Sequence, residues 1–396
     1  MVDLAYDVLV VGCGPAGATA ARLASKSGGS VCVVDGRQEI GNPVRCAELA
    51  GYGLLGILGQ KLPDACVGAR PKAGLLIGPK GERVALAGKL AQGLGGLVIH
   101  REVFDQHLAR LAARDGARIM LKTEARGLLV KDNKVVGARV SSFGREMNIP
   151  AGVVIGADGF TSQVGRWAGL DLRIDPADVR VGFQYTIVNC DLEDDTFFLY
   201  LGQRRAPGGF AWMVPKGEGT FNVGLMASME RASSTPKDLL DRFVASVAGL
   251  KKGNIIRRSA GAQVVAPPLS RPAAPGLLLC GECACRSDGL PGSGVANALA
   301  SGMLAGAVAG GAVAGSDTGN GPQESYIAHF NERFRDTAAS RLALARAMSG
   351  MTDGDISKVL GPFDGTQLAD MPAPEGLGPV AKGFPGLAKA FARLII

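Results

Sequence analysis

A glycine-rich turn between an apolar strand and a helix of small residues is the feature that most constrains the fold of this chain. The sequence runs from the apolar stretch DVLVVG through the turn GCGPAG into an alanine-rich segment, and then into a second apolar stretch, VCVVD, that ends at Asp35. A GxGxxG pattern is specific when it follows a strand, opens a helix and precedes an acidic residue by about twenty positions. Each condition is met, so this part of the chain predicts the βαβ unit of a Rossmann-like domain.

The residue types in this unit fit the pyrophosphate and ribose of a dinucleotide. Glycines allow the backbone to approach a pyrophosphate closely, and the helix N-terminus supplies unpaired N–H donors and a positive dipole. Asp35 can accept hydrogen bonds from ribose hydroxyls, and its carboxylate disfavours a cofactor with a 2′-phosphate. The cofactor-binding residues predicted in this unit are Gly12, Gly14, Pro15, Ala16, Gly17, Asp35 and Gly36.

Two later stretches favour FAD over NAD. Residues 153–156 form a short apolar run that ends in an Asp-Gly turn, and residues 277–279 form another that leads to Gly281 and Glu282. The turn 290–294 then opens a long segment of small residues, and the N-terminal amides of such a helix can face a flavin ring or a pyrophosphate. The cofactor contacts predicted from these stretches are Asp158, Gly281, Glu282, Gly292, Gly294 and Val295.

On these motifs the chain resembles the geranylgeranyl reductase family of FAD enzymes, within the p-hydroxybenzoate hydroxylase fold group. The resemblance covers roughly residues 5 to 310. It implies an α/β fold, α+β overall, in which a Rossmann-like FAD-binding domain carries an inserted antiparallel-sheet substrate domain and a C-terminal helical region. The expected boundaries are 1–60, 96–175 and 265–320 for the FAD domain, 61–95 and 176–264 for the sheet domain, and 321–396 for the helical region.

The segment GFAWMVPK, residues 209–216, resembles the aromatic-x-Trp-x-Phe-Pro-Lys strand of that family. Phe210, Trp212 and Val214 alternate and therefore share one face of a strand. The resemblance implies that Phe210, Trp212 and Pro215 line an isoprenoid pocket, although Val214 replaces the usual Phe. A half-buried hairpin strand, with the turn PKGEG and the partner TFNVGL, is the simpler interpretation, and both can hold. Long apolar substrates need such a wall because burial yields about 0.8 kcal/mol per methylene.

The loop NPVRCAE, residues 42–48, resembles the family loop whose cysteine lies near the flavin and is implicated in reduction. Cys46 is therefore the candidate proton donor or gate, and Arg45 is placed to tune its pKa or to hold an anionic headgroup. Arg45, Cys46 and Ala47 are also expected to contact the cofactor, as is Arg101 at the head of a predicted helix. Two alternatives stay open: Cys46 as a small buried hydrophobe, and Arg101 as a surface partner of Asp105.

The third motif departs from the family pattern, which commonly reads Gly-Asp-Ala-Ala-Gly. Glu282 keeps the charge but reaches one methylene farther, and Asp288 in the same loop is a candidate to compensate. Cys280, Cys283 and Cys285 form a CxxCxC cluster, but a metal or Fe–S site needs a fourth ligand that the sequence does not supply. No metal is therefore predicted. The eight cysteines show no disulfide framework, which is typical of a reducing compartment.

Secondary structure is expected to alternate between strand and helix to about residue 48, and to become irregular and glycine-rich to about residue 98. A helix should follow from Arg101, then a hairpin within 118–140 and strands after Trp167. Thr235, followed by Pro and Asp238, predicts a helix start. Further on, 326–334 predict an amphipathic helix, and 387–395 predict a terminus that either lies on a membrane surface or caps the substrate domain.

The formal net charge of +7 is spread along the chain, with few aromatic residues among the cations. This distribution argues against nucleic-acid binding and favours anionic phospholipid headgroups or an acidic electron carrier; a charge that serves solubility alone is the alternative. Residues 295–315 are uncharged, but Gly302, Gly306 and Gly310 predict close packing inside the protein, not a membrane span. The first strand begins too early for a signal peptide, so we expect a cytoplasmic protein with peripheral membrane contact as an alternative.

The hypothesis that follows is an FAD-dependent reductase of C=C bonds in the geranylgeranyl chains of archaeal membrane-lipid precursors. Reduced ferredoxin is the expected electron donor because no second nucleotide fingerprint is visible, and NADPH is the alternative. Two other functions compete: an FAD monooxygenase that uses O2 and NADPH on an aromatic ring, and a non-catalytic flavin- or lipid-binding protein.

Overall fold

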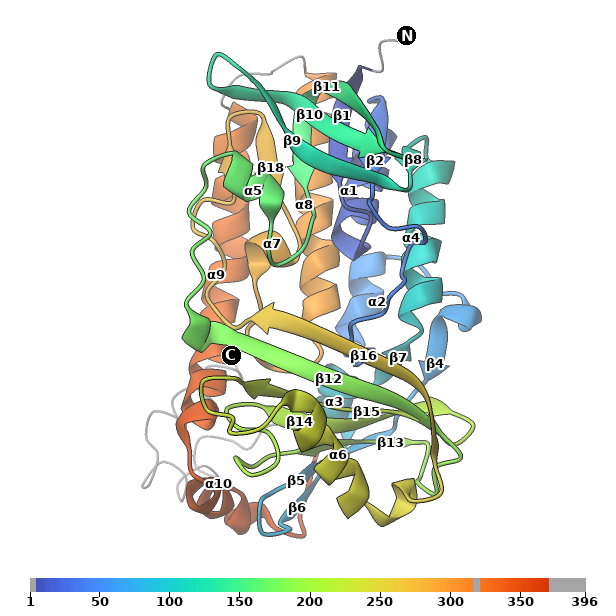
Figure 1. Ribbon diagram of the computed structural model, residues 1–396, viewed down its shortest axis with the longest axis vertical. Helices are drawn as coiled ribbons and strands as arrows, with labels where there is room; N and C mark the ends of the chain where they lie inside the picture. Colours follow the sequence, from blue (N-terminus) through green and yellow to red (C-terminus); the bar gives the residue numbers. More distant parts are fainter. Residues whose placement is uncertain (1–4, 316–320, 370–396) are drawn as a thin grey trace.

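A computed structural model describes residues 5–315 and 321–369 of the chain. The molecule is elongated and has two lobes that follow one another along its longest axis (Figure 1). One lobe carries a largely parallel sheet with long helices, and the other carries a mostly antiparallel sheet.

The first lobe is built on the predicted βαβ unit. Strand β1 (Tyr6–Val11) leads through the glycine turn into α1 (Pro15–Lys26) and then into β2 (Val31–Val34), which pairs with β1 in parallel. Across this sheet the strand order is β17-β18-β11-β1-β2-β8. The remaining strands are β8 (Arg118–Met120), β11 (Arg145–Gly156), β17 (Ala273–Ala274) and β18 (Leu277–Leu279). The predicted Rossmann-like fold class is confirmed.

A three-stranded antiparallel layer extends this sheet. Strands β9 (Thr123–Lys131) and β10 (Lys134–Ser142) form the predicted hairpin, and Asp132 and Asn133 turn it with φ of +49° and +59°. Positive φ at both central residues is the geometry of a two-residue hairpin turn. The third strand, β11, is longer than the predicted 153–156 because its first half pairs with β10 and its second half with β1.

Two helices of small residues pack closely on one another beside this sheet. Helix α8 (Gly294–Ala314) lies against α1, and a Cβ at Gly302 or Gly306 would clash with carbonyl oxygens of α1. Among the helices of the described residues, α8 is the one that is long and apolar enough to cross a membrane. However, 56% of its most apolar 18-residue stretch is buried inside the protein. Close packing, as the glycine spacing predicts, therefore accounts for its composition. Helix α4 (Arg101–Arg114) begins at the predicted residue.

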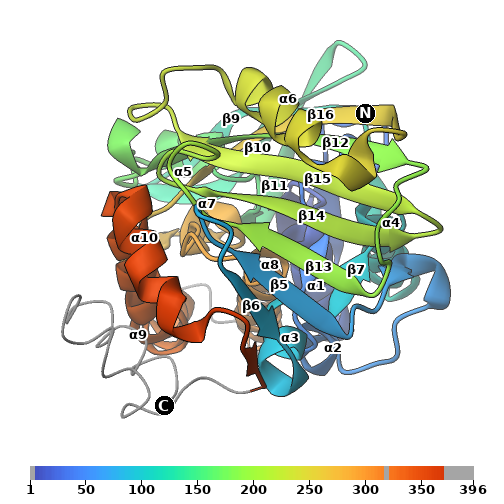
Figure 2. The ribbon, with the colours of Figure 1, turned by 90° about the horizontal axis from the view of Figure 1, so that it is seen from below.

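The second lobe is an eight-stranded sheet in the order β16-β12-β15-β14-β13-β5-β6-β19. Helix α6 (Pro236–Ser246) covers one face, and Thr235 caps it by accepting from the Asp238 N–H, as predicted. The opposite face is turned toward the first lobe (Figures 1 and 2). The strands are β5 (Ala73–Ile77), β6 (Arg83–Leu86), β12 (Val179–Val188), β13 (Thr196–Tyr200), β14 (Phe210–Gly217), β15 (Thr220–Ser228), β16 (Asn254–Val264) and β19 (Gln367–Leu368).

The expectation of an irregular region up to residue 98 is wrong. Strands β5 and β6 of this region join the second sheet, where β5 pairs in parallel with β13, more than 100 residues later in the chain. The pairing partner lies far away and the strands are short, so no local pattern reveals them. The other elements here are β3 (Leu49–Ala50), α2 (Gly53–Leu58), β4 (Val67–Ala69), α3 (Gly88–Gly95) and β7 (Leu97–Ile99).

The C-terminal region is helical and returns to the second sheet. Helix α9 (Gly321–Gly350) buries Tyr326, Phe330 and Phe334, as the amphipathic pattern predicts. Helix α10 (Asp353–Leu360) and strand β19 follow, and β19 adds an edge to the second sheet, which the sequence did not indicate. The predicted amphipathic terminus, residues 387–395, lies outside the described residues.

Candidate active site

A cavity of about 370 Å³ lies where the two lobes meet. The glycine turn before α1 and the turn before α8 line one side, the loop around Cys46 lies beside them, and β12, β14 and β16 form the opposite wall. Most of the predicted site residues converge here from distant parts of the chain. Those that line the cavity are Gly14, Pro15, Ala16, Arg45, Cys46, Ala47, Arg101, Phe210, Trp212, Gly281, Glu282, Gly292, Gly294 and Val295.

Gly12, Gly17 and Gly36 do not line this cavity. Gly12 has a φ of +99°, and a Cβ there would clash with the Ala157 carbonyl oxygen, whereas a Cβ at Gly17 would clash with the carbonyl oxygen of Gly12. These two glycines therefore allow the turn to pack against β11 and α1, while Gly14 faces open space. Gly12 and Gly17 of the motif therefore serve packing, and Gly14 leaves space for a ligand.

Asp35 lies at the end of β2 and is almost fully buried. Its carboxylate accepts hydrogen bonds from the backbone N–H of Cys13 (2.7 Å) and from Nε and Nη2 of Arg37 (2.9 and 2.7 Å). Burial opposes ionisation, but these bonds outweigh it and hold the pKa of Asp35 below its usual range. The carboxylate is thus charged and fixed in orientation, and its contact with a ribose stays a prediction.

Two residues predicted to contact ligands do not line the cavity. The carboxylate of Asp158 accepts from Ser162 Oγ (3.0 Å) and from the Val164 N–H (3.0 Å), so it orders the start of α5 (Gln163–Trp167). The cavity is lined by its neighbours Ala157 and Gly159 instead. Pro215 follows Val214 on β14, and strand alternation turns it to the opposite face, so it does not line the cavity.

The wall formed by the second lobe is apolar. Phe210 and Trp212 point from β14 into the cavity with ring centroids 5.8 Å apart, and Val214 continues the same face. The indole of Trp212 lies over Gly224 of β15, where a Cβ would come within 2.5 Å of the ring. Sequence reasoning missed two other apolar members of this wall, which come from β13 and β15: Leu199 and Met226.

A buried amide links this wall to the cysteine loop. Gln184 on β12 accepts a hydrogen bond from Nε1–H of Trp212 (2.9 Å) and donates one to the backbone carbonyl of Cys46 (3.1 Å). Gln184 is only 6% exposed, so neither bond competes with bulk water. The orientation of the indole and the position of the Cys46 backbone are therefore coupled through one side chain.

A buried ion pair holds the same loop to the second sheet. Glu48 is 2% exposed, and its carboxylate accepts from Nζ of Lys216, from Nδ2 of Asn222 (2.7 Å) and from the backbone N–H of Arg101 (2.8 Å). Thr186 in turn donates to Asn222 Oδ1 (2.8 Å). A buried charge of this kind is tolerated only when its partners satisfy it. The C-terminal part of this loop, from Cys46 to Glu48, is thus fixed by polar groups of the second lobe.

Two groups of the site face the Cys46 thiol. The backbone N–H of Glu48 donates to Cys46 Sγ (3.3 Å), and Arg101 also faces this sulfur. Arg101 forms two bonds of 2.8 Å to the carboxylate of Asp105, so the competing interpretation of an Arg101–Asp105 pair holds as well. Burial opposes the charge of Arg101, but Asp105 and Cys46 more than compensate and raise its pKa. Arg101 is therefore a fixed cation at the cavity.

Glu282 enters the cavity as predicted, whereas Asp288 does not compensate for it. The side chain of Glu282 is exposed to the open cavity, and desolvation by the surrounding walls raises its pKa to about 7 against the opposing effect of Arg101. Asp288 accepts from the Leu290 N–H (3.0 Å), Ser293 Oγ (3.1 Å) and Arg341 Nε (2.6 Å). These bonds engage both of its oxygens, so Asp288 shapes the turn before α8.

The three cysteines after β18 are buried, and two of them, Cys283 and Cys285, belong to the short helix α7 (Glu282–Cys285). Cys283 donates to the carbonyl of Cys280 (2.7 Å), and burial raises the pKa of Cys285 to about 12. A metal ligand must be a thiolate, which such surroundings disfavour. Within residues 5–315 and 321–369, no group of three or more His, Cys, Asp or Glu side chains is placed to hold a metal ion.

Similarity to known proteins agrees with this geometry. Residues 178–263, from β12 to β16, match the model of the geranylgeranyl reductase catalytic domain. A digeranylgeranylglycerophospholipid reductase of Methanothrix thermoacetophila is 37% identical over 366 residues, which is 92% of this chain and 93% of the relative. The chain belongs to the geranylgeranyl reductase family. A second such reductase, of Thermoplasma volcanium, is 34% identical over 98% of this chain and 99% of its own length.

Solved structures support the same assignment. A geranylgeranyl bacteriochlorophyll reductase-like protein from Thermoplasma acidophilum superposes with a TM-score of 0.91, at 34% identity and with 99% of both chains covered. A flavin-dependent brominase has a TM-score of 0.71 at 18% identity over 91% of this chain and 95% of its own, and so shares the fold alone. The predicted flavoprotein fold and the prediction of an FAD-dependent oxidoreductase are thereby confirmed.

The cavity fits FAD. The N-termini of α1 and α8 both open on it, and neither has a side-chain cap, so their first N–H groups are free to bind a pyrophosphate or the flavin ring. Gly14, Pro15 and Ala16 would hold the pyrophosphate, and Gly292, Gly294 and Val295 would approach the flavin.

Proposed function

We propose that this protein saturates the C=C bonds of geranylgeranyl chains in precursors of archaeal membrane lipids, with a digeranylgeranylglycerophospholipid as substrate. The observation that carries the proposal is a single cavity with cofactor-type glycine turns on one side and the apolar face of Phe210 and Trp212 on the other. Cys46 lies between them. The digeranylgeranylglycerophospholipid reductases that resemble the chain along most of its length support this substrate class.

The apolar wall supplies binding and water exclusion. An isolated alkene offers no polar group to the protein, so binding energy must come from burial, at about 0.8 kcal/mol per methylene. Phe210, Trp212 and Val214, with Leu199 and Met226, give a prenyl chain such a surface. Reduced FAD, when bound beside this wall, would supply the hydride for one alkene carbon.

The adjacent alkene carbon must receive a proton, and Cys46 is the proposed donor. Its Sγ–H bond breaks as the new C–H bond forms, and the resulting thiolate is stabilised by the N–H of Glu48 and by Arg101. Solvent then returns a proton to the sulfur. The bonds from Gln184 and Glu48 hold the loop so that the thiol stays at the cavity.

Reduced ferredoxin is the proposed electron donor, with NADPH as the alternative. The sequence shows a dinucleotide fingerprint at residues 12–17, which FAD would occupy, and no second fingerprint for NADPH is visible. The net charge of +7 favours an acidic carrier. We place the protein in the cytoplasm, and its net positive charge favours peripheral contact with an anionic membrane surface.

Anaerobic reoxidation tests the reaction. The protein is loaded with FAD, reduced with dithionite and mixed with geranylgeranyl phospholipid while the flavin absorbance is recorded. We expect oxidised flavin to return together with lipid chains heavier by two hydrogens for each bond reduced, measured by mass spectrometry. Reoxidation that requires O2 and hydroxylates an aromatic compound would instead identify a monooxygenase. Lipid binding without reoxidation would identify a non-catalytic protein.

A further inference from the structure

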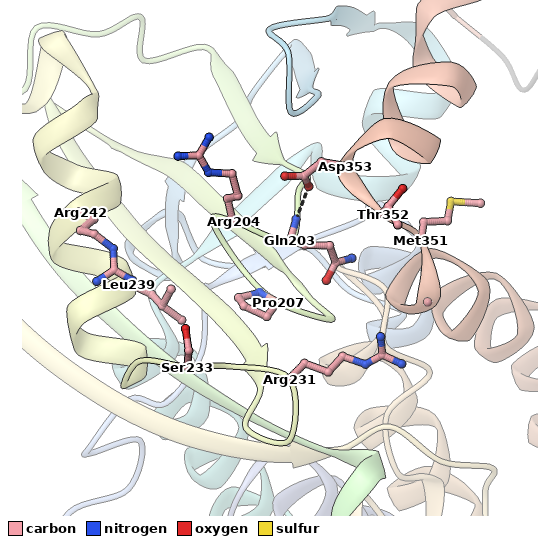
Figure 3. A pocket seen from close by; sticks show the side chains of 11 residues that line it. Gln203, Arg204, Pro207, Arg231, Ser233, Leu239, Arg242, Met351, Thr352 and Asp353 are labelled. Carbon is pink, nitrogen blue, oxygen red and sulfur yellow. Dashed lines mark hydrogen bonds between the residues drawn. The ribbon is translucent and has the colours of Figure 1, made fainter.

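A second cavity, of about 570 Å³, lies in the sheet lobe and is distinct from the active-site cavity. It is enclosed by the loop between β13 and β14, the segment after β15, helix α6 and the turn between α9 and α10 (Figure 3). Three arginines of three different segments line it: Arg204, Arg231 and Arg242. Asp353 is the acidic residue in its lining.

The three arginines of this pocket are exposed and have no ion-pair partner among the described residues. Within the described residues, none of the three guanidinium groups lies within 4.0 Å of a carboxylate oxygen, although fourteen other ion pairs form. Asp353 instead accepts the backbone N–H of Gln203 (2.5 Å), which the dashed line in Figure 3 marks. Asp241, next to Arg242 in the chain, is engaged by Lys237 and by Tyr185.

A fourth guanidinium lies beneath the floor of the pocket. Arg180 is 8% exposed, and it donates to the carbonyl of Gly208 (3.0 Å), to Ser349 Oγ (3.3 Å) and to two further carbonyls. Its hydrogen-bond acceptors are thus neutral. Asp178 and Glu230 attract this guanidinium, whereas Arg231 and Arg346 repel it. An anion on the other side of the segment 206–209 would add a further attraction for Arg180 and Arg231.

This floor also adjoins the active site. Arg180 and Gly208 line a cavity of about 40 Å³ that shares Phe210, Met226 and Leu290 with the active-site cavity. The arginine pocket is therefore next to the end of the apolar wall, on the far side of one loop. Arginine forks bind phosphate oxygens in pairs, and several around one recess match a phosphate group better than a carboxylate.

We propose that the pocket of Arg204, Arg231 and Arg242 binds the phosphate of a phospholipid headgroup. The headgroup belongs either to the prenyl lipid that is reduced or to a neighbouring lipid of the bilayer. The first assignment rests on the proposed function, whereas the second does not depend on it.

The test compares two triple variants with the native protein. R204A/R231A/R242A removes the pocket cations, and R114A/R139A/R145A removes three exposed arginines of the first lobe, so both lower the formal net charge by three. Normal flavin absorbance and melting temperature in each variant establish that it folds. The FAD-loaded proteins are then assayed in detergent with geranylgeranyl glycerophospholipid and with geranylgeraniol, and by sedimentation with vesicles of neutral lipid containing phosphatidylglycerol.

A rise of about tenfold or more in KM for the phospholipid alone, in the pocket variant and not in the control, assigns the site to the substrate headgroup. Unchanged KM values with loss of vesicle binding, again only in the pocket variant, assign it to bilayer lipid. If both variants behave alike in both assays, the phosphate site does not exist. If the native protein reduces neither compound, the proposed function fails, and the vesicle experiment still decides the proposal for bilayer lipid.

Discussion

The two lobes of the molecule encode their structure in different ways. In the first lobe, the first cofactor turn is built from consecutive elements: β1, α1 and β2 follow one another and meet in space. In the second, β5 pairs with β13 and β19 pairs with β6, across gaps of more than 100 residues. Residues of the cofactor turn can therefore be recognised locally, whereas the substrate wall depends on pairings that no short stretch of sequence specifies.

The candidate active site lies where the two lobes meet. Cys46 belongs to the first lobe by sequence, but its carbonyl is bound by Gln184 and the following Glu48 by Lys216 and Asn222, all from the second lobe. If this comparison is right, substitutions at the junction should affect chemistry and stability more than similar substitutions within one lobe.

The largest effect is expected from Cys46→Ala. Loss of a positioned proton donor should slow alkene reduction by about 10²- to 10⁴-fold, while FAD binding and the folded state persist because the glycine turns are untouched. Single-turnover reoxidation of the reduced flavin by the lipid measures the rate. Cys32→Ala, at a buried cysteine of β2, is the matched control. A Cys46→Ala variant with the native rate would exclude this thiol as the acid.

The next largest effect is expected from Glu48→Gln, which leaves the Lys216 ammonium buried without its counter-charge. Breaking one partner of such a pair costs about 3–5 kcal/mol of folding free energy. The matched control is Asp115→Asn, which removes the pair with Arg22 (2.8 Å) inside the first lobe. That pair is partly exposed and should contribute less than about 1 kcal/mol. Urea unfolding of both variants measures the difference, and equal losses would refute a special role for the junction.

The sequence predicted those parts of the site that are formed by short continuous segments of the chain. The turns at Gly14, Gly281 and Gly292 and the face of Phe210 and Trp212 all carry recognisable patterns and all reach the cavity. Other parts of the site had no such signal. Gln184 lies within an ordinary apolar strand pattern, and its role appears only when β12 and β14 are aligned through β15.

The same argument explains why two predicted contacts, Asp158 and Pro215, do not line the cavity. Asp158 follows a strand and precedes a glycine, so its position suggests a ligand contact, but its carboxylate accepts a hydrogen bond from the Val164 N–H. Pro215 belongs to a recognised motif, yet period-two alternation sends it to the face under α6. In both cases the backbone position was right and the direction of the side chain was decided by neighbours.

A smaller effect is expected from the Trp212–Gln184 link. Trp212→Phe keeps the ring but leaves Gln184 Oε1 buried without a donor, which costs about 1–3 kcal/mol. The double variant with Gln184→Leu should cost less than the sum of the single changes because the two side chains share one bond. Trp167→Phe, at the exposed tryptophan of α5, is the control. Additive losses in thermal unfolding would show that the link does not couple wall and loop.

The smallest effect is expected from Glu282, through pH. Desolvation by the cavity walls raises its pKa from 4.5 to about 7 in the folded apoprotein, so between these values the folded state binds more protons than the unfolded state. This contribution to stability is therefore fully present below about pH 4.5 and is lost as the pH rises to about 7. Glu282→Gln should flatten the dependence of the melting temperature on pH in that window, whereas Glu146→Gln, on the exposed hairpin, should not. An unchanged profile in Glu282→Gln would mean that this carboxyl titrates as it does in water, and a steeper decline would mean that the cavity beside Arg101 lowers its pKa; either result would contradict the prediction.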